Sequence, residues 1–248
     1  RYYRDSIMHT IIKTPLKNEH EYLYSDLGYF FLKEIVENMV DTTLDQYVQA
    51  NIYKPLGMHR TTFHPRANFQ MEEIVPTEMD KLFRKQLIHG DVHDPAAAML
   101  GGVGGHAGLF GNANDLAKLM QFYLDGGSYA NYSFLTDSIV KEFTRCQFCE
   151  NENRRGAGFD KPQINDEGGP ACTCVSPLSF GHSGFTGTYA WADPEHQLIY
   201  VFLSNRIHPT ATNKKLIKMN IRTDIQEVIY QAIELNQLDT TAQNQSEK

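Results

Sequence analysis

The chain has 248 residues, enough for one sizeable domain or two small ones. Its hydrophobic fraction of 41% and charged fraction of 21% are ordinary for a globular protein. The net charge of −7 gives no basis for binding nucleic acid or anionic lipid. No apolar run approaches the roughly 20 residues of a membrane-spanning helix.

The first part of the chain predicts helices. Residues near Ser6–Ile12 look helical, and residues 27–40 repeat apolar side chains at spacings of three and four, which is typical of an amphipathic helix. Asp26 stands directly before that helix, where an N-cap carboxylate would sit. A second helix is predicted from Leu44 to about Tyr53, followed by a proline.

Later segments change from helix to strand and back. One helix is predicted to start at Asn112–Asp115 and to end at Gly126-Gly127, and another runs from Phe134 to about Arg145. The runs Thr188–Ala192 and Leu198–Ser204 predict a β-hairpin, and Lys218–Leu235 predicts a final helix. This order indicates an α+β fold with a mainly antiparallel sheet. We expect one domain over residues 1–238 and a disordered tail over 239–248.

The four cysteines form two close pairs, Cys146-x-x-Cys149 and Cys172-x-Cys174. Four thiolates in two pairs suit a zinc ion, but C-x-C is tighter than the usual zinc spacing. Free thiols, or one or two disulfides, explain the same pattern. We expect no zinc here.

A histidine cluster invites a second metal hypothesis. His89 and His93-Asp94 lie four residues apart, and His106 follows. These residues would make the chain a metal-dependent hydrolase. Gly90 and Pro95 argue against one regular helix that presents both imidazoles. We therefore expect no metal and no other cofactor.

Four short motifs occur in a familiar order. Tyr24-Ser25-Asp26 precedes a helix, and Pro55-Leu56-Gly57-Met58 is followed by Thr61-Thr62-Phe63. The segment GHAGLF covers Gly105–Phe110, and His182-Ser183-Gly184 opens the predicted hairpin. Together, over about residues 20–235, they resemble class C β-lactamases and the related penicillin-binding-protein-type esterases and D-peptidases. This resemblance implies a β-lactamase/transpeptidase-like fold, in which a helical part packs on the sheet.

The resemblance also implies roles for named residues. Tyr24 matches the family's proton-transfer tyrosine, and His182 matches the basic residue of its third motif, so both are the expected catalytic residues. Asp26, Ser183, Gly184 and Phe185 are the expected substrate-binding residues. The backbone N–H of Phe185 would be an oxyanion-hole donor. The resemblance also implies cleavage of an amide or ester bond through an acyl-enzyme. The implied substrates are small esters, D-amino-acid peptides of the cell wall or β-lactams.

The family's S-x-x-K element does not precede Tyr24, because none of the preceding 23 residues forms it. We expect the N-terminal part of the domain, with the nucleophilic serine, to be an upstream segment of the same polypeptide. The isolated chain should then be inactive. A literal match at Ser138–Lys141 follows Tyr24 inside a predicted amphipathic helix, and we interpret it as chance.

Simpler interpretations remain for each residue. Tyr24 could be a core tyrosine, Asp26 only a helix cap and His182 a structural histidine. An acid at Asp26, where the family usually has Asn, would repel a substrate carboxylate and makes a β-lactam a doubtful substrate. The chain could instead be a non-catalytic module of a larger exported protein. By resemblance, the expected location is the periplasm or another extracytoplasmic compartment of a bacterium.

Overall fold

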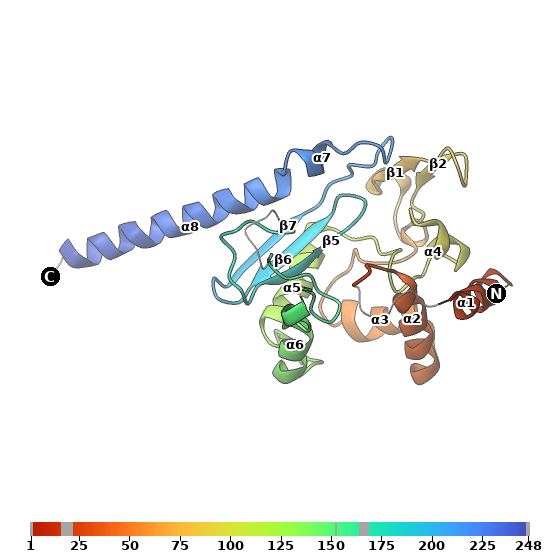
Figure 1. Cartoon of the computed structure of the whole chain (residues 1–248), viewed down its shortest axis with the longest axis horizontal. Coiled ribbons are helices and arrows are strands. Elements are labelled where there is room, and N and C mark those ends of the chain that lie inside the picture. The colour runs from red at the N-terminus through yellow and green to blue at the C-terminus, as the bar shows by residue number, and fades with distance from the viewer. Residues whose placement is uncertain (1, 16–21, 152, 164–168, 247–248) are drawn as a thin grey trace. The chain divides into compact units, whose positions relative to one another are not determined.

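The computed structural model describes residues 2–15, 22–151, 153–163 and 169–246, and Figure 1 labels its helices and strands. The residues fall into two compact units. Unit 1 contains residues 1–116 and 207–212, and unit 2 contains residues 117–206 and 213–248. The single domain over residues 1–238 stays a prediction.

Unit 1 begins with helices where the apolar spacing predicted them. Helix α1 covers Tyr2–Lys13, and α2 covers Leu27–Val40 with the predicted bounds. Phe30 of α2 is buried. Lys33 is buried beside it, because its ammonium group pairs with the Glu37 carboxylate at 2.6 Å. The helix thus buries one charged residue without leaving that charge unpaired.

Asp26 does not cap α2 with its side chain, which corrects one expectation. Its φ of −79° and ψ of −14° already lie in the helical region, and its carboxylate accepts no capping hydrogen bond. Side-chain capping normally needs an extended N-cap residue. The hydroxyl of Ser25 instead accepts a hydrogen bond from the backbone N–H of Leu27 at 3.2 Å.

The helix predicted for Leu44 to Tyr53 is present in two parts. Helix α3 covers Leu44–Val48, and a π-helical turn, η1, covers Gln49–Tyr53. The Glu37 carboxylate accepts a hydrogen bond from the N–H of Leu44 at 2.8 Å, so α2 supplies a cap for α3. The wider turn ends where the proline at position 55 stops the helix.

A two-stranded antiparallel sheet completes unit 1. Strand β1 covers Pro76–Met79 and β2 covers Leu87–His89. The returning segment 207–212 binds β1: the N–H of Met79 donates to the carbonyl of residue 209 at 3.0 Å, and Glu78 accepts from the N–H of residue 211 at 2.8 Å. Residues distant in sequence therefore close this unit.

The other short elements connect these parts. They are η2 (Pro65–Ala67), η3 (Met71–Glu73), α4 (Pro95–Met99), β3 (Ser128–Tyr129), β4 (Tyr132–Ser133), η4 (Cys149–Asn151) and α7 (Lys215–Lys218). Two longer helices were predicted from the sequence: α5 covers Ala113–Leu124, and α6 covers Asp137–Thr144.

Unit 2 contains a three-stranded antiparallel sheet in the order β5-β6-β7. Strand β5 covers Phe180–Ser183, β6 covers Tyr189–Asp193 and β7 covers Leu198–Phe202. The hairpin of β6 and β7 confirms the predicted one. His182 pairs with Ala190 across the sheet, so the His182 side chain lies on the same sheet face as that of Ala190.

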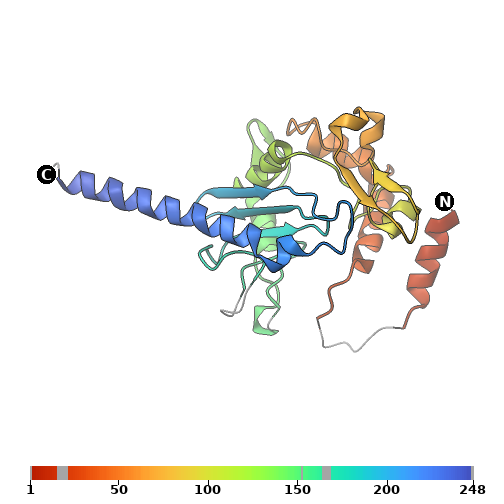
Figure 2. The same cartoon turned by 90° about the horizontal axis from the view of Figure 1, so that it is seen from above.

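Both faces of this sheet are covered, and every residue of β6 is buried. Figure 2 shows α8 (Ile221–Ser246) crossing one face, with α5 on the other. On the α5 side, Phe159 packs edge-on between Tyr123 and Phe180, with ring centroids 5.2 and 5.1 Å away. Because successive side chains of a strand point to opposite faces of the sheet, the core of unit 2 has one layer on each face.

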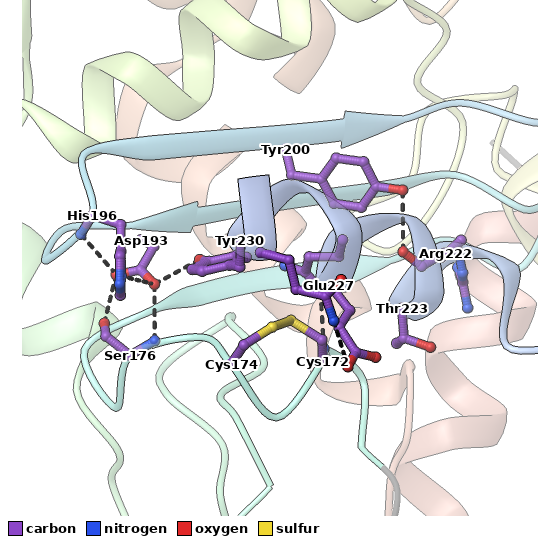
Figure 3. The surroundings of a disulfide bond; sticks show 12 residues. Cys172, Cys174, Ser176, Asp193, His196, Tyr200, Arg222, Thr223, Glu227 and Tyr230 are labelled. Carbon is purple, nitrogen blue, oxygen red and sulfur yellow. Dashed lines mark hydrogen bonds and ion pairs between the residues drawn. A yellow bond between two sulfur atoms is a disulfide. The ribbon is translucent and has the colours of Figure 1, made fainter. Parts of the chain in front are cut away.

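The core under α8 combines aromatic packing with a buried carboxylate. Figure 3 shows this region around the Cys172–Cys174 disulfide. Asp193, which is fully buried, accepts hydrogen bonds from the Ser176 N–H at 2.8 Å and from the Tyr230 hydroxyl at 2.6 Å. Burial raises the pKa of Asp193, but hydrogen bonds from the Ser176 hydroxyl and N–H, from Tyr230 and from His196 together outweigh it and hold that pKa below its ordinary value.

Helix α8 runs to Ser246, past the end predicted near Leu235 and into the tail expected to be disordered. Among the described helices, none is long and apolar enough to cross a membrane.

Candidate functional site

The predicted third motif lies at the tight turn between β5 and β6. His182 and Ser183 end β5, and Gly184 begins the turn, with its N–H donating to the Thr188 carbonyl at 2.8 Å. A Cβ on Gly184 would collide with the Thr188 hydroxyl. A side chain at this position would therefore require the Thr188 hydroxyl to move, because no backbone atom lies closer than 3.9 Å to the added carbon.

The turn exposes a large aromatic residue. The Phe185 side chain is 63% exposed, and the guanidinium of Arg206 lies over its ring at 4.8 Å from the centroid. Gly187 has φ +114°, and its carbonyl accepts a hydrogen bond from the Ser204 hydroxyl at 2.7 Å. The backbone of the turn is thus held on both sides. The oxyanion-hole role of the Phe185 N–H stays a prediction.

His182 has a partner that the motif does not contain. A guanidinium nitrogen of Arg155 lies 2.9 Å from Nε2 of His182, while Nδ1 of His182 lies 2.8 Å from the carbonyl oxygen of Ser183. Arg155 was not singled out from the sequence. The only local signal is the basic pair Arg154-Arg155 in a loop, and such a pair is usually solvated.

The segment that carries Arg155 is fixed to the edge of β5. Asp160 and Gly181 exchange two backbone hydrogen bonds, of 2.7 and 3.0 Å. The buried Asp160 carboxylate forms ion pairs with Arg154 at 2.9 Å and with Arg155 at 3.6 Å. One carboxylate therefore faces two guanidinium groups next to the motif histidine.

Tyr24 and Asp26 lie in unit 1, in the segment that leads into α2, and Asp26 is the residue directly before that helix. Tyr24 is 59% exposed, so it is not a core tyrosine. Asp26 is also exposed. His182, Ser183, Gly184 and Phe185 lie together in unit 2. The meeting of the two groups in one cleft stays a prediction.

The literal S-x-x-K match in α6 has no catalytic geometry. The Lys141 side chain is 76% exposed and pairs with the Asp137 carboxylate at 2.6 Å. Ser138 is exposed and shares a hydrogen bond with the Thr136 hydroxyl at 3.0 Å. Lysine and serine thus have separate partners, which agrees with the interpretation of this match as chance.

The histidines of the possible metal cluster also have separate partners. His89 contacts the Ile74 carbonyl at 2.5 Å, and His93 contacts the Glu78 carboxylate at 2.6 Å. His106 donates to Asp94 at 2.9 Å and stacks on the Phe30 ring with centroids 4.5 Å apart. Within the part of the chain that is described, no three His, Cys, Asp or Glu side chains gather as metal ligands would.

The cysteines are paired as two disulfides, Cys146–Cys149 and Cys172–Cys174. All four cysteines of the sequence are accounted for by these bonds. Of the alternatives open from the sequence, the structure has the two-disulfide form. Each bond closes a very short loop, so each constrains only its local turn.

Comparison with known proteins identifies the family. The family model described as Beta-lactamase matches residues 1–219, most of the chain. The chain belongs to the beta-lactamase family. Membership in this family confirms the resemblance that rested on the order and spacing of the four short motifs.

Relatives of this beta-lactamase family member include a Salmonella schwarzengrund protein named "Putative D-alanyl-D-alanine carboxypeptidase". It is 36% identical over 230 residues, which are 86% of this chain and 52% of that protein. The chain thus spans about half the length of the curated relatives it matches.

Solved structures show the same fold. A beta-lactamase from Mycobacterium bovis matches with a TM-score of 0.56 and 20% identity, over 85% of this chain and 64% of that one. Simvastatin synthase from Aspergillus terreus matches with a TM-score of 0.64 and 16% identity, over 92% of this chain and 61% of that one. The α+β, β-lactamase/transpeptidase-like fold expected from the sequence is therefore confirmed.

Proposed function

We propose that the chain is part of a serine hydrolase that cleaves D-alanyl-D-alanine peptides of the cell wall through an acyl-enzyme. The observation that carries this proposal is the His182-Ser183-Gly184 turn on β5, in a family member that is 36% identical to a protein named for this reaction. Small esters are the next substrate class. β-Lactams are the third substrate class, and the Asp26 carboxylate would repel their carboxylate and the terminal carboxylate of a D-alanyl-D-alanine peptide alike.

The proposed division of labour follows the chemistry of the acyl transfer. A serine hydroxyl is a weak nucleophile and needs a neighbouring base. Tyr24 would help to move its proton, and His182 would join that proton network from the other wall of the site. The Phe185 N–H would stabilise the oxyanion, and Asp26, Ser183 and Gly184 would contact the substrate.

The nucleophile is proposed to come from an S-x-x-K element outside residues 1–248. No such element precedes Tyr24 in the printed sequence, and Ser138 and Lys141 in α6 have other partners. This segment, rather than a separate protein or a cofactor, would be the partner that completes the site. In a well-studied serine protease, loss of the nucleophile from the coupled catalytic residues lowers the rate by a factor on the order of 10⁶.

An extracytoplasmic location is proposed with this function. Two disulfides support it, because such bonds persist mainly in oxidising compartments. A substrate in the cell wall would be met in the same place.

The test is covalent labelling followed by intact-mass spectrometry. The 248-residue chain is treated with a fluorescent penicillin and with an alkyl fluorophosphonate. A longer form that carries an S-x-x-K element before Tyr24 is treated in parallel. We expect no adduct on the printed chain and one adduct per molecule on the longer form. A stoichiometric adduct on the printed chain, Ser138 included, would overturn the assignment of the nucleophile.

A second outcome concerns the substrate. The longer form should release D-alanine from a D-alanyl-D-alanine peptide. If it is labelled by the fluorophosphonate but releases no D-alanine, the serine hydrolase class stands and the peptide substrate is rejected.

A further inference from the structure

The contacts of His182 determine where its proton lies. A guanidinium group can only donate hydrogen bonds, and a carbonyl oxygen can only accept them. Because Arg155 faces Nε2 at 2.9 Å and the Ser183 carbonyl faces Nδ1 at 2.8 Å, the proton must lie on Nδ1 and the lone pair on Nε2. These contacts therefore select one of the two tautomers of the ring, the one protonated on Nδ1.

The position of Arg155 is itself fixed by contacts of its segment. Asp160 bonds to the backbone of Gly181, next to His182 in β5, and its carboxylate lies 3.6 Å from the second terminal nitrogen of Arg155. Phe159 anchors the same segment between two aromatic rings. Only 22% of the Arg155 side chain is exposed. An arginine held in this way loses little conformational entropy when it binds a neighbour.

We propose that Arg155 is a positioning residue that sets the tautomer and ring orientation of His182. The role of the tautomer in catalysis rests on the proposed function. In that setting, Nε2 carries no proton of its own and is the nitrogen that can accept one. Until a substrate binds, the Arg155 guanidinium donates a hydrogen bond to the lone pair on Nε2 of His182. The tautomer itself does not depend on any activity, so it can be tested separately.

The test is nitrogen-edited NMR of the chain with ¹⁵N-labelled histidine, at a pH where imidazoles are neutral. The His182 signals are assigned from their loss in His182→Gln. In the unmodified chain, we expect the pattern of a ring protonated on Nδ1. In Arg155→Met, the ratio of the two tautomers should move by about tenfold towards Nε2–H, because a charge-assisted hydrogen bond has been removed. Arg155→Lys keeps a donor and should keep the Nδ1–H pattern if the ammonium group reaches the ring.

A matched control is available next to Arg155. Arg154→Met removes a guanidinium that pairs with the same Asp160 carboxylate but does not contact His182. It should leave the His182 tautomer unchanged. If Arg154→Met changes the tautomer pattern as Arg155→Met does, the cause is a general disturbance of the loop structure around Asp160, and the proposal fails.

Other outcomes also decide the proposal. An Nε2–H pattern in the unmodified chain contradicts it, and so does an Nδ1–H pattern that survives Arg155→Met, because the Ser183 carbonyl alone would then suffice. If Arg155→Met does not fold, the unmodified chain and Arg155→Lys still give the tautomer. A confirmed tautomer in a chain whose longer form releases no D-alanine would leave this inference standing and reject the substrate.

Discussion

At the scale of single residues, Lys161 is the group whose burial has the clearest consequence. Its side chain is 6% exposed, and its ammonium group donates to the Leu178 carbonyl at 3.0 Å. Burial lowers the pKa of Lys161 to about 8, although the charge of Asp193 acts in the opposite direction. In the unfolded chain, a lysine keeps a pKa of about 10.4. Between these two values, the unfolded state holds a proton that the folded state has released.

This difference predicts a rise in stability with pH. The unfolded state binds more protons in that window, so the free energy of unfolding increases as pH rises from about 8 to about 10.4. Relative to Lys161→Met, the unmodified chain should gain about 2 kcal/mol between pH 7.5 and 9.5. Urea unfolding of both proteins at several pH values measures this. A constant difference across that range would show that Lys161 stays charged when folded.

Arg155 shows why part of the site could not be predicted. The side chains of Arg155 and His182 are 27 positions apart and meet only because Asp160 pairs with Gly181 at the edge of β5. No local pattern predicts such a bridge. The His182-Ser183-Gly184 motif could be predicted because its residues are consecutive and its turn geometry is local.

At the scale of elements, Asp94 joins two segments of unit 1. Its Oδ1 atom accepts from the N–H of Ala97 at 2.7 Å, which caps α4, and from Nε2 of His106 at 2.9 Å. The hydrogen bond from His106 is the largest influence and lowers the pKa of Asp94, against the effect of its burial. A cap and a bond to a buried histidine thus depend on one oxygen atom.

The two roles predict different costs for two substitutions. Asp94→Ala removes the cap and leaves buried Nε2 of His106 without an acceptor, so it should cost about 2 to 4 kcal/mol of unfolding free energy. Asp94→Asn keeps an acceptor oxygen and should cost less than half as much at neutral pH. Urea midpoints at a constant m-value give both figures. Equal losses would mean that charge, not the acceptor, holds this junction.

The same junction has a pH dependence of known sign. Because the folded pKa of Asp94 is depressed, its contribution is present above the unfolded carboxyl pKa, near 3.9, and is lost as pH falls below it. Asp94→Asn should therefore lose less stability than the unmodified chain on acidification, which the same urea series at lower pH measures.

Secondary structure was predicted best where periodicity is strong. Helix α2 has the predicted bounds, and β6 and β7 lie within one or two residues of the predicted hairpin. The final helix is interrupted, because Asn220 takes a left-handed conformation with φ +51° between α7 and α8. Asparagine tolerates the left-handed conformation, but the spacing of the neighbouring apolar residues does not predict a helix break there.

At the scale of the whole molecule, the proposed site needs Tyr24 of unit 1 and His182 of unit 2 to face one cleft. Proton relay requires near hydrogen-bond reach, so we expect their side chains within roughly 10 Å of each other. Ser25→Cys supplies a new thiol for a nitroxide label, since the native cysteines are paired. The label should broaden the His182 ring signals, which should return when the nitroxide is reduced.

A label farther along the same helix is the control for this measurement. Asn38 is exposed near the end of α2, roughly 16 Å from the start of that helix at 1.5 Å per residue. Asn38→Cys should affect His182 much less. Signals of His182 that are untouched by the label at position 25 would place the two residues on different surfaces and remove the case for a shared site.

The discontinuous course of unit 1 also affects how the chain is made. Glu78 and Met79 of β1 find their partners in residues 207–212, which leave the ribosome only after the whole β5-β6-β7 sheet. Glu78 and Ala211 are 133 positions apart, so at the usual 5–20 residues per second the delay between their synthesis is about 7 to 27 s. Unit 1, which is begun first, is thus completed only after the three strands of unit 2 have been synthesised. Until then, the edge of β1 must stay available without pairing elsewhere.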